Sequence, residues 1–213
     1  MKSDGGITME KQKKTFFSAK SITFLAVLLA LVIVLQVFSG FFKIGTTSLS
    51  FVLIPIVLGG MILGPLYGAI LGVAFGVVVI IDALAGLDPF TLILLQERPI
   101  TTVLLCLIKG TAAGYFSGLI YHLIKNKNKL VASFVAAAAA PIINTGIFIL
   151  GALLMSETLK NNFVADGQTL MYFLIIVCAG VNFLIELALN LVLAPSINTV
   201  ENVIEKQLLS RSK

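Results

Sequence analysis

Residues 50–86 form the stretch SFVLIPIVLGGMILGPLYGAILGVAFGVVVIIDALAG, which is almost entirely apolar and is broken once, by the Gly59-Gly60 and Gly64-Pro65 pairs. One helix needs roughly 20 residues to cross a bilayer, and this run is longer. The break therefore predicts two apolar helices folded back on each other, near 50–63 and 66–86. This hairpin indicates a membrane protein.

Glycines recur every fourth residue in the second of these helices, at Gly68, Gly72 and Gly76. Residues four apart share one face of a helix, so the helix has a stripe without side chains. Such a stripe allows a neighbouring helix to approach closely. It has no use on a surface that faces lipid, and we expect it to be buried between helices.

The composition agrees with a membrane protein. Hydrophobic residues make up 58% of the 213 positions, the mean hydropathy is +1.06, and 12% of residues are charged, against about 25% in a soluble domain. Apolar runs of about 20 residues without alternation predict helices rather than a barrel. The expected fold class is thus an all-α integral membrane protein, and the net charge of +5 is a topology signal rather than a sign of nucleic-acid binding.

Six apolar runs are long enough to be considered as spans, and a shorter one at 89–96 is too brief to cross and is expected to be interfacial or re-entrant. No signal-peptide pattern precedes the first run, so we expect it to be retained. The chain divides into a basic tail (1–20), a six-transmembrane-helix bundle (21–195) and an amphipathic tail (196–213). The predicted spans are 21–39, 50–63, 66–86, 99–124, 130–155 and 170–194.

The basic residues are concentrated in three places: the amino-terminal tail, the loop at 125–129, and the carboxyl-terminal tail. An even number of spans places all three on one side of the membrane. By the positive-inside rule, both termini are expected to be cytoplasmic.

Several polar residues fall inside the apolar runs, where an ionised side chain at mid-membrane costs about 2.5–3.5 kcal/mol unless it has a partner. Asn182 and Glu186 lie four residues apart and share a helical face, as does Asn190. Lys109 lies in the fourth run, and Asn144 lies in the fifth beside a threonine. A Lys109–Glu186 ion pair with a structural role is one interpretation. Contact with a substrate is the other, and we place Glu186 and Asn190 toward the cytoplasmic half.

Arg98 and Glu97 precede the fourth run on the expected outer side. One interpretation is an interfacial charge pair that reaches toward lipid headgroups. In the other, the planar guanidinium of Arg98 binds a carboxylate, phosphate or carbonyl of a substrate. The second interpretation favours an anionic or strongly polar substrate.

For three other kinds of residue we predict no catalytic or metal-binding role. Cys106 and Cys178 lie inside apolar runs and are expected to be small buried hydrophobes. His122 has no second histidine or cysteine at helical spacing, so no metal site is predicted. Asp82 is expected to cap the outer turn. We predict no cofactor.

Motifs along the chain together resemble those of the substrate-binding S components of energy-coupling factor (ECF) transporters, the bacterial vitamin importers. The resemblance extends over about residues 18–195. The motifs are Ala26-x-x-x-Ala30, Ser50-Phe51-x-x-Ile54-Pro55, Gly64-Pro65-x-x-Gly68-x-x-x-Gly72, Asp82 near the end of the third span, and Pro141-x-x-Asn144-Thr145.

The resemblance implies a protein of the bacterial plasma membrane that captures a water-soluble vitamin and is not itself an enzyme. Its partners would be a transmembrane T subunit and two cytoplasmic ATPases. Ala26 and Ala30 would face the T subunit, although packing within the chain is the alternative. Pantothenate is the favoured vitamin, with riboflavin or pyridoxine possible. The expected substrate-binding residues are Arg98, Asn144, Phe148, Tyr172, Asn182, Lys109, and Phe42 and Thr47 in a lid loop.

An intramembrane enzyme and a secondary transporter or channel are the two alternative classes of function. An intramembrane enzyme would need a Gly-x-Ser-x-Gly elbow or a His-Glu-x-x-His pair, and the sequence has neither. A self-sufficient secondary transporter or channel stays open, because Lys109 and Glu186 are able to form an ion relay.

Overall fold

The computed structural model describes residues 19–40, 43–44, 47–48 and 51–210, and these are almost wholly helical. A two-stranded antiparallel hairpin lies between the first two helices, with Lys43 opposite Ser48. In chain order the elements are α1 (Ala19–Ser39), β1 (Lys43–Ile44), β2 (Thr47–Ser48), α2 (Leu53–Ile62), α3 (Pro65–Leu84), α4 (Pro89–Glu97), α5 (Pro99–Ile124), α6 (Lys129–Leu153), α7 (Ser156–Asn162), α8 (Leu170–Tyr172), the π-helix η1 (Phe173–Gly180) and α9 (Val181–Ser210).

Among the residues that the structure describes, five segments are long and apolar enough to cross a membrane. They lie in α1, α3, α5 and α6, and in the continuous helical segment Leu170–Ser196 formed by α8, η1 and the start of α9. The apolar helix α2 is shorter, with 10 residues. The predicted all-helical membrane fold is therefore confirmed, whereas the count of six crossings depends on α2 and stays a prediction.

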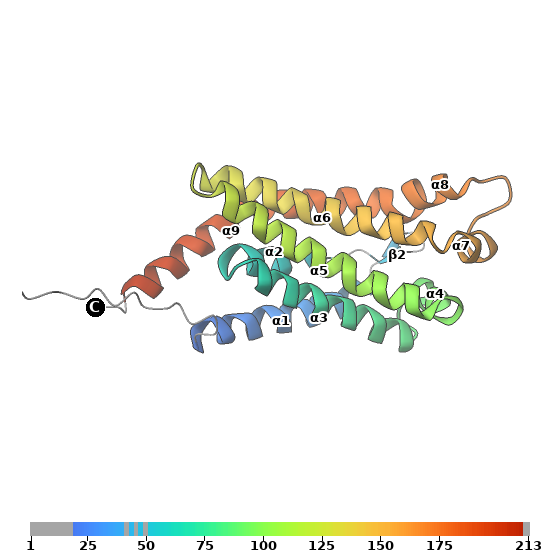
Figure 1. The fold of residues 1–213 in the computed structure, drawn as a ribbon, viewed down its shortest axis with the longest axis horizontal. Helices are drawn as coiled ribbons and strands as arrows, with labels where there is room; N and C mark the ends of the chain where they lie inside the picture. The colour runs from blue at the N-terminus through green and yellow to red at the C-terminus, as the bar shows by residue number, and fades with distance from the viewer. Residues whose placement is uncertain (1–18, 41–42, 45–46, 49–50, 211–213) are drawn as a thin grey trace, which may run out of the picture.

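The helices lie side by side along the long axis of the molecule (Figure 1). The start of α1, the α5–α6 turn and the end of α9 lie at one end, and α4 and α7 lie at the other. This arrangement agrees with termini on one side of the membrane, and their cytoplasmic location stays a prediction from charge. α9 continues through Pro195 to Ser210, so the expected tail begins within a helix.

The glycine stripe of α3 is buried against α5. A Cβ added at Gly68 would overlap the backbone of Gly114, and one added at Gly72 would overlap the backbone of Gly110. The expected stripe is thus confirmed as a helix-packing surface, where backbones touch without intervening side chains. The partner stripe on α5, which was not predicted, begins with Gly110 and Gly114 against α3 and continues to Gly118, which meets the backbone of Gly60 in α2.

The turn between α2 and α3 needs glycine for a different reason. Gly64 has a φ of 121°, a backbone conformation that L side chains rarely adopt. Pro65 follows at the first position of α3, where its fixed φ suits a helix start and its missing N–H is not needed. The Gly64-Pro65 pair therefore ends one apolar helix and begins the next.

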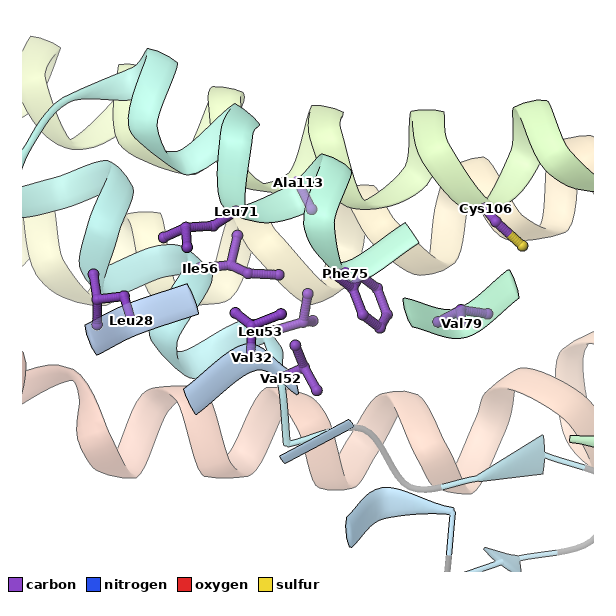
Figure 2. Packing of buried hydrophobic residues seen from close by; sticks show 10 residues of the cluster. All are labelled: Leu28, Val32, Val52, Leu53, Ile56, Leu71, Phe75, Val79, Cys106 and Ala113. Atoms are coloured by element: carbon purple, nitrogen blue, oxygen red, sulfur yellow. The ribbon is translucent and has the colours of Figure 1, made fainter. Parts of the chain in front are cut away.

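Three hydrophobic clusters hold the bundle together. The first joins α1, α2, α3 and α5, and Figure 2 shows its side chains gathered between these helices. The second, around Phe90 and Phe173, lies at the end where α4 and α7 are found. The third, around Met61 and Tyr121, lies where α2, α5 and α6 meet. Phe75 of the first cluster and Phe90 of the second both line the cavity described below.

The α4–α5 corner is tied to α7 by polar contacts. Arg98 Nη2 lies 3.6 Å from Glu157 Oε2, and Asn162 Nδ2 donates a hydrogen bond of 2.7 Å to Glu97 Oε1. The hydrogen bond from Asn162 is the largest cause of a lowered pKa of the exposed Glu97 carboxyl. The corner is thereby fixed at the edge of the bundle.

Candidate functional site

A cavity of about 100 Å³ lies inside the helix bundle. One water needs roughly 10–15 Å³ of such space, so the cavity has room for part or all of a small organic molecule. Its wall combines aromatic rings, amides, hydroxyls and charged groups from six helical segments. The lining residues are Gln36, Ser39, Phe75, Val79, Asp88, Phe90, Thr91, Lys109, Asn144, Thr145, Phe148, Cys178, Ala179, Asn182, Phe183 and Glu186.

The periodicity of the last span brings its polar residues to the cavity. Asn182 and Glu186 are one helical turn apart in α9 and both line the wall. The preceding eight residues form the π-helix η1, which supplies Cys178 and Ala179. π-helical turns inside α-helices are rare and are found frequently at functional sites. The placement of η1 on the cavity wall fits that pattern.

Lys109 of α5 projects between two aromatic rings. Its Nζ lies 5.6 Å from the centroid of the Phe75 ring and 5.5 Å from that of the Phe148 ring. Both distances suit cation–π attraction, worth about 0.5–2 kcal/mol each. Among the described residues, no carboxylate oxygen lies within 4.0 Å of Lys109 Nζ. The considered Lys109–Glu186 ion pair is therefore not formed as a direct contact.

Buried acceptors without a hydrogen-bond partner in the described part of the chain line the cavity. They include Oδ1 of Asn144, a residue that is 7% exposed, and Oε2 of Glu186, which is 3% exposed. A buried polar atom left without a partner costs about 1–3 kcal/mol. Donors from a bound molecule or from water would remove that cost. Glu186 is thus a wall residue of the cavity, and its location toward the cytoplasmic half and its role, structural or in substrate contact, stay predictions.

Gln36 and Asp82 connect α1 to α3 beside the cavity. Gln36 Nε2 donates a hydrogen bond of 3.1 Å to Asp82 Oδ2, and both residues are buried. The Asp82 side chain therefore binds α1, in contrast to the expected cap, and Asp88 is the residue that caps α4. Gln36 was not predicted as a cavity residue, although a lone amide within the apolar run 21–39 is a sequence signal for one.

The cap residue Asp88 also borders the cavity. Its Oδ1 accepts from Thr91 N at 3.2 Å, and its Oδ2 accepts from Thr91 Oγ1 at 2.5 Å. Both carboxylate oxygens of Asp88 are therefore engaged locally. Thr91 and Phe90 of α4 also line the cavity.

Four of the predicted binding residues meet at this cavity: Lys109, Asn144, Phe148 and Asn182. The structure does not bring Arg98 or Tyr172 there, since the Arg98 side chain is 52% exposed beside Glu157 and Tyr172 is 50% exposed. Phe42 and the side chain of Thr47 lie outside the described residues. A binding role for those four residues stays a prediction.

A charged, amide-rich cavity inside an apolar helix bundle defines a multi-pass membrane protein suited to holding a small polar solute. Residues 20–198 match the family described as ECF transporter, substrate-specific component. The chain therefore belongs to this family, and the resemblance found in the motifs is confirmed. Comparison with curated proteins gave no match.

Membership makes the chain a substrate-specific component of an ECF importer. Proteins of this kind have a substrate and work with an energising module made of a T subunit and ATPases. The family is one of transporters and not of enzymes.

Proposed function

We propose that this chain is the high-affinity substrate-binding subunit of an ECF importer for a water-soluble vitamin in the bacterial plasma membrane. The observation that carries the proposal is the enclosure of Lys109, Asn144, Asn182 and Glu186 around one cavity within an apolar bundle. Polar groups at this depth are costly to insert, so their convergence indicates a functional site.

Pantothenate is the favoured vitamin. It combines a carboxylate with an amide and two hydroxyl groups, which complement a cation and several acceptors. Riboflavin and pyridoxine are the other candidates.

The energising module would bind the exposed face of α1. Ala26 and Ala30 lie one turn apart on that face, and both are exposed. Small residues at this spacing allow another helix to pack closely. ATP would be hydrolysed by the partner ATPases, since this sequence has no Gly-x-x-x-x-Gly-Lys-Ser/Thr phosphate loop.

A secondary transporter or channel is the alternative function. The observation that favours it is the presence of Lys109 and Glu186 on the same cavity wall, where an intervening proton or ion would connect them.

Transport in liposomes separates the two functions. Vesicles with the chain alone and vesicles with the chain plus the T subunit and ATPases are loaded with ATP and offered radiolabelled pantothenate, riboflavin or pyridoxine. Accumulation that needs the module and ATP supports the proposal. Counterflow by the chain alone would overturn it in favour of the secondary transporter.

A further inference from the structure

The Lys109 ammonium has three N–H donors and no described acceptor for them. No hydrogen bond from Lys109 Nζ to a described residue is formed, and the nearest groups identified are the faces of Phe75 and Phe148. Aromatic faces attract the charge but accept no ordinary hydrogen bond. Lys109 is partly buried and lines the cavity, so its ammonium is available to an acceptor, preferably an anion, that is held there.

The other charged groups that face the cavity do not fill that position. Asp88 is engaged by the backbone and hydroxyl of Thr91. Glu186 attracts Lys109 through space but lies beyond 4.0 Å from its Nζ. Lys109 and Glu186 thus line the same cavity without pairing directly.

Two acceptors on the same wall need donors. Glu186 Oε2 and Asn144 Oδ1 have no donor among the described residues, and both side chains are more than nine-tenths buried. Hydroxyl or amide groups of a bound molecule supply such donors. The wall thus combines a cation that suits an anion with acceptors that suit neutral donors.

We propose that the cavity selects a small monocarboxylate that also has hydroxyl or amide groups. The carboxylate binds Lys109, which Phe75 and Phe148 hold in place, and the hydroxyl or amide groups donate to Asn144 Oδ1 and Glu186 Oε2. This inference rests on the proposed function and adds to it the chemical class of the substrate and its orientation. Lys109, rather than the exposed Arg98, becomes the anion-binding residue.

The test compares each acid with its uncharged counterpart. Binding of pantothenate and pantothenol, biotin and biotinamide, and nicotinate and nicotinamide to the detergent-purified chain is measured by calorimetry, alongside riboflavin, pyridoxine and thiamine. We expect one acid to bind and its neutral counterpart to bind about 10- to 150-fold more weakly. That range corresponds to a charged hydrogen bond of about 1.5–3 kcal/mol.

Variants assign the selectivity to Lys109. Lys109→Met is expected to bring the acid-to-neutral affinity ratio close to one, and Lys109→Arg to keep most of it, because a guanidinium also binds carboxylate and stacks on rings. Lys125→Met is the matched control, since Lys125 lies in contact with the Tyr121 ring at 5.8 Å but does not line the cavity. If Lys109→Met does not fold, the affinity ratio is measured in the double variant Lys109→Met/Glu186→Gln, which carries neither ionisable group.

The outcomes separate this inference from the proposed function. An acid preference in the natural chain that Lys109→Met abolishes supports the inference. A neutral or cationic vitamin as the tightest ligand, a neutral counterpart within about threefold of its acid, or a ratio unchanged in the Lys109 variants overturns it and leaves the vitamin-binding function intact. Failure of every vitamin to bind overturns the proposed function and this inference with it.

Discussion

The α3–α5 interface and the cavity are neighbouring regions of one bundle, and they are built in opposite ways. The interface brings backbones into contact through Gly68, Gly72 and Gly110, and it leaves no room for an added Cβ. The cavity leaves about 100 Å³ free and exposes acceptors that have no described partner. Lys109 and Gly110 are consecutive in α5, so one helix serves both regions. One helix thus provides a close-packed face and, at the adjacent residue, part of a polar cavity wall.

Changes in the glycine interface should have the largest effect. We expect Gly72→Ala to lower the stability of the purified chain by about 1–3 kcal/mol or more, because its Cβ meets the backbone of Gly110, which has no rotamer to change. The thermal midpoint in detergent, followed by size-exclusion chromatography, measures the loss.

The control for that change is Gly146→Ala in α6. A Cβ at Gly146 meets nothing within 4 Å, so the substitution should leave the midpoint unchanged or raise it, given the better helix propensity of alanine. Equal losses in the two variants would contradict the contrast between a filled interface and open space.

The link between Gln36 and Asp82 should have the next largest effect. Gln36→Leu leaves the buried Asp82 carboxyl without its donor, at a cost of about 1–3 kcal/mol. The double variant Gln36→Leu/Asp82→Leu removes both partners of the hydrogen bond. Its loss of stability should be smaller than the sum of the losses in Gln36→Leu and Asp82→Leu. A coupling energy near zero in this double-mutant cycle would show that the hydrogen bond does not hold α1 to α3.

Cavity residues should respond differently from interface residues. Asn144→Leu removes an acceptor that has no described partner, so we expect the empty protein to keep or slightly raise its midpoint. The same change should weaken vitamin binding at least about tenfold, because a donor of the ligand loses its acceptor. A thermal midpoint that falls as far as in Gly72→Ala would show instead that Asn144 stabilises the fold.

The smallest effect is expected at the α4–α5 corner, which belongs to neither region. The hydrogen bond from Asn162 holds the pKa of Glu97 below its usual value. This hydrogen bond therefore stabilises the folded state at pH values above the usual glutamate pKa of about 4.3. The stabilisation is lost as the pH falls through the folded-state pKa of Glu97. Asn162→Ala should therefore reduce the small fall in midpoint between pH 7 and pH 3.5. Asn161→Ala is the control, and because Glu97 is fully exposed the difference should be slight.

The interface was predictable from sequence and the cavity only in part. A glycine at every fourth position favours close backbone contact with any neighbouring helix. Gly68, Gly72 and Gly76 could therefore be predicted as a helix-packing surface from the sequence alone. The stripe of Gly110, Gly114 and Gly118 on α5 was not predicted. These glycines lie in a run that also contains threonine, serine and aromatic residues, so the run is less uniformly apolar than that of α3. Helical spacing likewise brought Asn182 and Glu186 to one face.

The remaining cavity residues depend on contacts between distant segments. Gln36 lines the wall and donates a hydrogen bond to Asp82, 46 residues away, and no local pattern indicates that pairing. Arg98 was a reasonable candidate for an anion site from its charge alone, yet Glu157 of α7, far along the chain, lies beside it. The π-helix η1 was also beyond prediction, because its sequence has the same apolar character as an ordinary span.

Native mass spectrometry of the detergent-purified chain tests the central claim most directly, which is that this cavity holds a vitamin. The account predicts a one-to-one complex with a small molecule whose mass identifies a water-soluble vitamin, and loss of that adduct in Lys109→Met but not in Lys125→Met. An empty protein that also binds no member of a vitamin panel at nanomolar concentration would contradict the account.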